Sequence, residues 1–283
     1  MQVQLARTIK LLRESVTALK SDGGTLALVP TMGALHEGHL ALVARAKEEA
    51  DHVAASIFVN PAQFGEGEDF DAYPRTEERD RELLEAAGCD LLWAPSPSEV
   101  YPDGYATTVS VTGVSEGLCG GARPGHFDGV ATVVAKLFNQ VAPDVALFGE
   151  KDYQQLAVIR RMVRDLDFDI RIVGVPTVRE ADGLALSSRN RYLSEEERAA
   201  AVALPDAMGE AAEAIAGGAD VGATLIDAKA KLFEAGFSTV DYIELRDAET
   251  LEPMAMLEGP ARMLAAARIG TTRLIDNIAV LPR

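Results

Sequence analysis

The sequence is poor in cysteine, in basic residues and in long hydrophobic runs, and each shortage excludes a class of protein. Cys89 and Cys119 are the only cysteines among 283 residues, too few for a disulfide framework. The 27 Lys and Arg residues face 44 Asp and Glu residues, and this net charge of −17 argues against a general binder of nucleic acids or anionic membranes. No apolar run reaches membrane-spanning length, and residues 1–7 lack the hydrophobic segment of a signal peptide. We therefore expect a cytoplasmic, reduced protein.

The first two thirds of the sequence have the alternating pattern of an α/β protein. Apolar runs of strand length lie at 25–29, 53–59, 89–93, 145–148 and 170–175, and helical patterns separate most of them. This alternation predicts a Rossmann-like parallel sheet with helices on both faces, in a domain that spans residues 1–176. The β-branched segment 107–111 is expected to add a short strand. Alanine-rich helical patterns and three strand-like runs predict a smaller C-terminal α+β domain at 177–283.

The segment PTMGALHEGHL, residues 30–40, joins the first of these strands to a helix. Such a junction places a helix N-terminus, with its unpaired N–H groups, at the edge of the sheet where anions bind. Gly33 and Gly38 allow the backbone to approach a ligand, and His36 and His39 are three residues apart on one face of the helix. An imidazole there can donate a hydrogen bond to the charge on a leaving phosphate. The pattern predicts the phosphate-binding turn of an ATP-using enzyme.

Two other interpretations of these histidines are open at this point. Both could be surface histidines in a glycine-containing loop, because a short H-x-G-H string is not specific. A zinc site is the second alternative. The zincin helix needs H-E-x-x-H with ligands four apart, and His36 and His39 are one residue short of that spacing. The spacing therefore disfavours metal ligation by this pair.

Two further segments combine charge with a turn. Gly149-Glu150-Lys151-Asp152 follows a strand and begins a helix, and a cation at that place opposes the helix dipole, so an anionic partner is expected. The alternative is a solvated lysine. Residues 187–191, SSRNR, combine hydroxyl, guanidinium and amide donors, a composition that suits either phosphate oxygens or a helix-capping surface loop.

Three polar residues near the ends of predicted elements are less informative. Gln63 and Gln155 can offer neutral donors and acceptors to a polar substrate, but from composition alone ordinary surface glutamines are the better explanation. His126 comes just before a helix, where a structural role is a better explanation than a catalytic one. Composition alone assigns none of the three to a site.

Several segments, taken in order, resemble the pantoate-β-alanine ligases, a family also called the pantothenate synthetases. The segments are PTMGALHEGHLALV, SIFVNPAQFG, DAYPRT, RPGHFDGVATVV, LFGEKDYQQL and ADGLALSSRNRYL, with DYIELRD and TTRLIDNI extending the likeness toward the C-terminus. The family belongs to the nucleotidyltransferase superfamily with HIGH-type signatures. The resemblance implies ATP-dependent amide formation in two steps: pantoate and ATP give pantoyl adenylate and pyrophosphate, and β-alanine then displaces AMP. It also implies Mg²⁺ bound with ATP, and a homodimer.

The resemblance implies roles for individual residues as well. The ATP-binding positions would be Met32, Gly33, Ala34, Leu35, His36, Glu37, Gly38, His39, Gly149, Glu150, Lys151, Asp152, Val178, Leu186, Ser187, Ser188 and Arg189. His36, His39, Lys151 and Arg189 would be catalytic, with His39 as proton donor. Gln63 and Gln155 would hold pantoate, and Gln63 would also lie near β-alanine. No protein side chain is expected to ligate Mg²⁺ directly, and Asp80 is a candidate for its water shell.

The chain departs from related synthetases at one loop, because LSSR at 186–189 stands where they carry a lysine-rich KMSKS sequence. We expect Lys151 to supply the cation that this loop lacks. Two other functions stay open from the sequence. One is a nucleotidyltransferase that leaves the nucleotide on its product, and the other is a non-catalytic nucleotide-binding module. No nucleic acid or membrane partner is expected in any of these cases.

Overall fold

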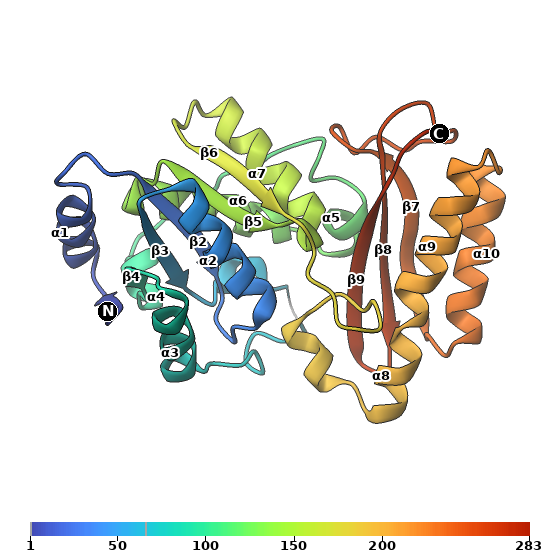
Figure 1. Cartoon of the computed structure of the whole chain (residues 1–283), viewed down its shortest axis with the longest axis horizontal. Helices are drawn as coiled ribbons and strands as arrows, with labels where there is room; N and C mark the ends of the chain where they lie inside the picture. Colours follow the sequence, from blue (N-terminus) through green and yellow to red (C-terminus); the bar gives the residue numbers. More distant parts are fainter. Residues whose placement is uncertain (1, 66) are drawn as a thin grey trace. The chain divides into compact units, whose positions relative to one another are not determined.

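The computed structural model describes residues 2–65 and 67–283 (Figure 1). Met1 and Glu66, which fall in the predicted first domain, lie outside the described residues. The chain divides into two compact units, the first formed by 1–112, 123–150 and 158–176 and the second by 113–122, 151–157 and 177–283. The main division therefore falls at residue 176, but two short segments before it group with the second unit.

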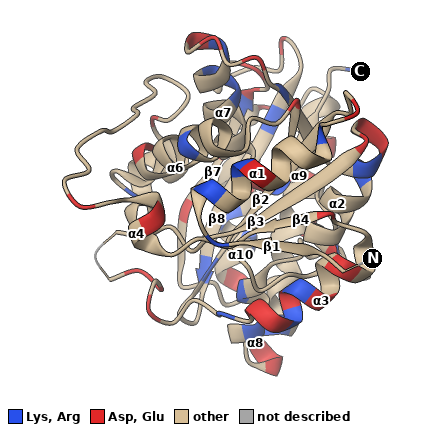
Figure 2. Ribbon diagram, turned by 90° about the vertical axis from the view of Figure 1, so that its left-hand side faces the viewer, with Lys and Arg blue, Asp and Glu red and all other residues tan. Residues whose placement is uncertain are grey.

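The first unit is built on a six-stranded parallel sheet with the strand order β1-β4-β3-β2-β5-β6. Its strands are β1 (Gln4–Ala6), β2 (Leu26–Thr31), β3 (His52–Ile57), β4 (Leu91–Trp93), β5 (Val145–Gly149) and β6 (Arg171–Val175). The central strands β2 and β3 are buried almost throughout, as expected for a sheet that is covered on both faces. The ribbon in Figure 2 shows charged residues mainly in helices and loops, for example in α3 (Glu77–Ala87).

Helices cover both faces of this sheet. They are α1 (Ile9–Leu19), α2 (Glu37–Glu49), α3, the short α4 (Pro97–Val100), α6 (His126–Val141) and most of α7 (Tyr153–Asp165). On one face, Val43 of α2 and Leu84 of α3 share a buried cluster with Val29 of β2. On the other face, Trp93 of β4 donates its indole N–H to Gln140 of α6 at 3.1 Å. These contacts fix the sheet between two helical layers.

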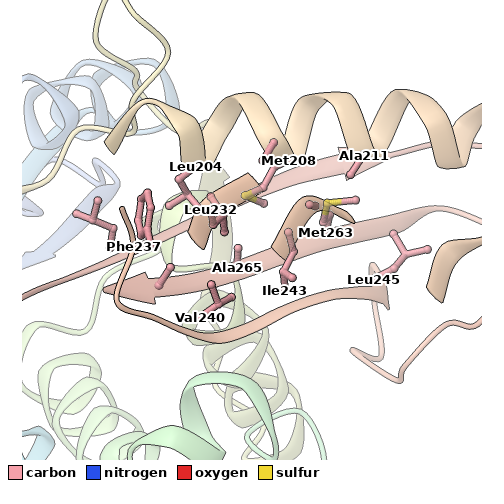
Figure 3. Close-up of a cluster of buried hydrophobic side chains, with 14 of the residues drawn as sticks. Leu204, Met208, Ala211, Leu232, Phe237, Val240, Ile243, Leu245, Met263 and Ala265 are labelled. Atoms are coloured by element: carbon pink, nitrogen blue, oxygen red, sulfur yellow. The ribbon is translucent and has the colours of Figure 1, made fainter. Parts of the chain in front are cut away.

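The second unit contains a three-stranded antiparallel sheet, β7 (Thr239–Asp247), β8 (Ala261–Ile269) and β9 (Thr272–Val280). Its helices are α5 (Leu118–Ala122), α8 (Glu195–Ala201), α9 (Ala203–Ala216) and α10 (Val221–Glu234). Figure 3 shows side chains of the strands and helices meeting in its core, among them Met208, Leu232 and Met263. None of the helices in the described parts of the chain is long and apolar enough to span a membrane.

The predicted architecture, a Rossmann-like parallel sheet followed by a smaller α+β part, is confirmed. One predicted strand is wrong: residues 107–111 form no strand. The backbone N–H of Val109 donates to the hydroxyl of Thr132 on α6 at 2.9 Å. Side-chain bonding to a helix thus replaces strand pairing in this segment. The sequence analysis also missed β1, which has only three residues and pairs with β4.

Candidate active site

The H-x-G-H turn lies at the end of β2, and its two histidines begin helix α2. His36 is the N-cap residue, and its Nδ1 accepts the backbone N–H of Gly38 at 3.1 Å. The Nδ1 of His39 accepts the backbone N–H of His36 at 3.3 Å, which completes a reciprocal capping box. Each Nδ1 is therefore an acceptor, and a neutral imidazole must then carry its proton on Nε2. The backbone bonds assign the same tautomer to both rings.

The two rings lie side by side, with centroids 4.1 Å apart and planes tilted by 40°. Gly38 permits this arrangement, because a Cβ at that position would be 2.9 Å from Cε1 of His36. The neutral rings thus carry their Nε2–H donors at a helix N-terminus, where partial positive charge also favours an anion. The turn has the chemistry expected of a phosphate-binding site.

Asp80, on the neighbouring helix α3, binds the backbone of the turn between β2 and α2. Its side chain is 1% exposed, and its two oxygens accept the backbone N–H groups of Ala34 and Leu35, each at 2.8 Å. Thr76 also donates its hydroxyl to this carboxylate. Ala34 has φ of +51°, a conformation that costs energy for a residue with a Cβ, and the two bonds oppose that cost. Asp80 thus anchors the turn, and its contact with the water shell of magnesium stays a prediction.

Gln63 lies beside the same turn, in the short 3₁₀ helix η1 (Pro61–Gln63) that follows β3. Its amide nitrogen donates to the sulfur of Met32 at 3.2 Å, and its amide oxygen accepts from Asn60 Nδ2 at 3.1 Å. The side chain is mostly buried, so its orientation is set by these neighbours. The first unit therefore brings Met32, His36, His39 and Gln63 to one edge of the sheet.

Asn60 and Tyr101 support Gln63, and the sequence analysis assigned neither to the site. Asn60 is 1% exposed, donates to the carbonyl of Gly129 at 3.1 Å and accepts the hydroxyl of Tyr101 at 2.8 Å. Burial raises the pKa of Tyr101, so the phenol stays protonated and keeps donating. In the sequence Asn60 follows an apolar, strand-like run, but its partners Gly129 and Tyr101 lie far away in the chain, so its support of Gln63 was not predictable.

His126 holds the backbone of Gln63. Its Nε2 lies 3.0 Å from Nη1 of Arg123, and because a guanidinium only donates, that nitrogen must accept. Nδ1 then donates to the carbonyl of Gln63, 2.8 Å away. Arg123 also forms a two-pronged ion pair with Glu68, and this hydrogen-bonded guanidinium lowers the pKa of the carboxyl. The geometry favours a structural role for His126.

The remaining predicted positions cluster in the second unit, apart from Gly149 and Glu150 at the end of β5. Lys151 lies in the single turn η2 (Glu150–Asp152), and its carbonyl accepts Nδ2 of Asn277 at 2.9 Å. Val178 accepts the backbone N–H of Leu186 at 2.9 Å, which places it beside the predicted second phosphate loop. In that loop Ser187 caps η3 (Ser188–Tyr192) by accepting the N–H of Arg189 at 3.2 Å.

The adjacent glutamines of α7 have different surroundings. Gln154 is 4% exposed, donates to the carbonyls of Val114 and Glu116 at 3.1 and 3.2 Å, and accepts the N–H of Cys119 at 3.0 Å. Gln155, the predicted pantoate ligand, is only partly buried. Among residues 2–65 and 67–283, no three His, Cys, Asp or Glu side chains form a group that could hold a metal ion.

These features define a class of protein. A parallel sheet whose second strand leads through H-x-G-H into a capped helix is the arrangement of nucleotide-binding α/β enzymes. The family model described as pantoate-beta-alanine ligase matches residues 4–279. The chain belongs to the pantoate-β-alanine ligase family.

Known relatives agree with this assignment. The chain is 63% identical over 278 residues to a pantothenate synthetase from Sphingopyxis alaskensis, covering 98% of this chain and 100% of the relative. A pantothenate synthetase from Novosphingobium aromaticivorans is 64% identical over 277 residues, covering 96% and 97%. The crystal structure of pantothenate synthetase from Thermus thermophilus matches with a TM-score of 0.94 at 50% identity, covering 99% and 100%. A pantoate-beta-alanine ligase from Francisella tularensis, complexed with beta-gamma ATP and beta-alanine, matches with a TM-score of 0.83 at 34% identity, covering 98% and 97%.

Proposed function

We propose that the protein condenses pantoate with β-alanine, using ATP, through a pantoyl adenylate. Membership of the family supports this reaction, as does the crystal structure of the Francisella tularensis ligase in complex with beta-gamma ATP and β-alanine. The observation that carries the proposal is the paired capping of α2, in which both histidines accept a backbone N–H at Nδ1, so that each neutral ring carries its proton on Nε2. Magnesium enters as MgATP and is thus part of the substrate.

In the first step the pantoate carboxylate attacks the α-phosphorus of ATP. A new bond forms between carboxylate oxygen and phosphorus, the bond to the bridging oxygen of the β-phosphate breaks, and pyrophosphate leaves with the electron pair. Negative charge grows on the leaving oxygen, and the Nε2–H groups of His36 and His39 are donors suited to stabilise it. Lys151 and Arg189 would add positive charge to the phosphates.

In the second step the amine of β-alanine attacks the acyl carbon of the adenylate. A carbon–nitrogen bond forms, the carbon–oxygen bond to AMP breaks with its electron pair going to the phosphate oxygen, and the proton lost by the nitrogen passes to water. We assign Gln63 and Gln155 to the polar groups of pantoate, and Gln63 also to β-alanine. The contacts of Gln63 with Met32 and Asn60 support this role, because they orient its amide before any substrate arrives.

Product analysis tests the proposed function. The protein is mixed with MgATP, pantoate and β-alanine, and nucleotides and acids are separated by chromatography. We expect AMP, pyrophosphate and the amide in equal amounts, and no amide when any one substrate is omitted. A stable nucleotide adduct of either acid, without amide, would overturn the proposal in favour of a nucleotidyltransferase.

We further propose that the chain acts as a homodimer in the cytoplasm, as the family resemblance implies. Light scattering coupled to size-exclusion chromatography measures the assembly directly. A mass of about twice the 30.2 kDa of one chain is expected, and a mass equal to one chain would contradict the dimer.

A further inference from the structure

We propose that Asp276 and Asn277, adjacent residues of β9, are positioning residues. Together they hold two segments in place, the turn η2 around Lys151 and the predicted second phosphate loop at 186–189. Both are 3% exposed, although their side chains are polar. Buried polar groups of this kind are retained where they are fully bonded. This inference rests on the proposed function, because it concerns the residues that would contact ATP phosphates.

Asp276 anchors the hairpin at 179–185, which leads into the predicted second phosphate loop. Arg179 donates to both of its carboxylate oxygens, at 2.7 and 2.8 Å, in the two-pronged geometry that guanidinium and carboxylate share. The same guanidinium donates to the carbonyl of Gly183 at 2.9 Å. Arg179 also forms a β-bridge with Ala185, so its side chain ties the turn between these two residues to β9. Leu186, the start of the loop, follows directly.

Asn277 anchors Lys151. Its Nδ2 donates to the Lys151 carbonyl at 2.9 Å, and its Oδ1 accepts Nε of Arg262 at 2.6 Å. The guanidinium of Arg262 lies 4.3 Å from the ring centre of Tyr153, the first residue of α7. The position requires an amide, because one end of the side chain must donate and the other must accept.

The alternation of side chains along a strand explains how neighbours can reach separate loops. Asp276 pairs across the sheet with Ala265, which lies in the core beneath the helices α9 and α10, together with Leu184 of the hairpin. Asn277 pairs with Leu264 and points to the opposite face, as successive strand residues do. The backbone N–H of Asn277 also donates to Asp276 at 2.7 Å. One dipeptide of β9 thus fixes two basic loops from two faces of one sheet.

Asn277→Asp tests this inference. The variant keeps size and shape but places a carboxylate oxygen where the Lys151 carbonyl now finds a donor, so the turn must move. We expect KM for ATP to rise and kcat/KM for ATP to fall about tenfold, as small misplacements near reacting groups do. KM for β-alanine, assigned to Gln63 of the first unit, should change less than twofold. A merely structural role would lower the fraction of active protein and leave both KM values unchanged, and that result would overturn the inference.

Two further variants keep the test decisive if Asn277→Asp folds poorly. Arg179→Lys retains the charge but loses the two-pronged contact with Asp276, and it should raise KM for ATP in the same direction. Thr272→Val is the matched control, because Thr272 is a buried residue of β9 whose hydroxyl has no hydrogen-bond partner among the described residues. The control should match the parent in both KM values. Parent-like values for Arg179→Lys and Asn277→Asp would refute the inference.

The activity of the parent protein shows whether a negative result bears on this inference or on the proposed function. If the parent forms no amide from the three substrates, the proposed function fails before any variant is compared. If the parent and Thr272→Val are active, Lys151→Ala is impaired, and the β9 and Arg179 variants match the parent, only the positioning inference fails. Binding of ATP measured by calorimetry gives a second readout, since its dissociation constant does not depend on the fraction of active protein.

Discussion

Nδ1 of His39 accepts the backbone N–H of His36 at 3.3 Å, so the second histidine of the motif caps the helix that the first one begins. In each ring, therefore, Nδ1 caps the helix, while Nε2 is the nitrogen proposed to contact phosphate. The two roles can be separated by substitution, because asparagine places an acceptor near the Nδ1 position and glutamine places a donor near the Nε2 position. This separation is the basis of the first prediction.

His39→Asn should keep the cap and lose the donor. We expect its adenylation rate in a single turnover to fall by about two orders of magnitude, equivalent to roughly 3 kcal/mol, while its melting temperature stays near that of the parent. His39→Gln should show the reverse bias, with a smaller loss of rate and a lower melting temperature because the cap is weakened. Equal rates for His39→Asn and the parent would show that Nε2 takes no part in the chemistry.

Lys151→Ala should impair the use of ATP far more than it impairs folding. The side chain is a cation near the start of α7, where it opposes the helix dipole, so its removal should change stability by only a few tenths of a kcal/mol. Pyrophosphate exchange into ATP measures the first step, and urea denaturation measures stability. A clear loss of stability together with parent-like exchange would assign Lys151 a structural role.

Asp80→Asn should weaken both the fold and the first chemical step. One carboxylate oxygen becomes an NH₂ group that faces the N–H of Ala34 or Leu35, and an unsatisfied buried donor costs about 1–3 kcal/mol. Glu82→Gln, an exposed position of the same helix α3, is the control and should leave both properties unchanged. Denaturation curves and single-turnover rates of the two variants give the comparison. A stability equal to the parent's would contradict the anchoring role of Asp80.

The adjacent glutamines should give opposite results. Gln154→Ala removes the partner of four backbone groups in residues 114–119, so we expect it to lower stability by about 1–3 kcal/mol. Gln155→Ala should leave stability unchanged and raise KM for pantoate, measured by pantoate-dependent pyrophosphate exchange without β-alanine. If Gln155→Ala instead abolished ATP binding with KM for pantoate unchanged, its assignment to pantoate would be wrong.

Stability should depend on pH through Glu68. The hydrogen-bonded Arg123 lowers the pKa of Glu68 in the folded chain below its ordinary value of 4.5. Because the folded state then binds this proton more weakly than the unfolded state, the ion pair stabilises the protein fully above pH 4.5 and loses its effect as the pH falls through the lowered pKa. The free energy of unfolding of the parent should exceed that of Glu68→Gln at neutral pH.

That difference should shrink in acid, and urea denaturation between neutral and acidic pH measures it. Glu196→Gln, at an exposed position, should show little difference from the parent at any pH. A gap between the parent and Glu68→Gln that widens as the pH falls would show that the ion pair with Arg123 is not its source.

Sequence and structure agree best where structure is decided by nearby residues. The turn from β2 to α2 was predictable because an apolar run, two glycines and two histidines lie within about fifteen residues, and their spacing already implies a shared helix face. The fold class was predictable from the alternation of strand and helix patterns for the same reason.

The hydrogen bonds that hold the site residues in place were not predictable, because the two residues of each bond are far apart in the sequence. Asp80 bonds to residues 45 and 46 positions earlier, and in the sequence it is one acid among several in a charged helix. The hydrogen bond from Asn277 to Lys151 spans 126 positions. Polar side chains of this kind follow no periodicity, so only the folded chain reveals which of them are buried and paired. The missing strand at 107–111 has the same origin, since its partner is Thr132.

The anchor in β9 has a consequence for the order in which the protein becomes competent during synthesis. A ribosome makes the chain from its N-terminus, so the parallel sheet and the Lys151 turn emerge long before Asp276 and Asn277 are translated. A nascent chain that stops short of β9 lacks the amide that holds the Lys151 carbonyl. From the positioning inference we therefore expect full competence for ATP only after the third strand of the small sheet has been added.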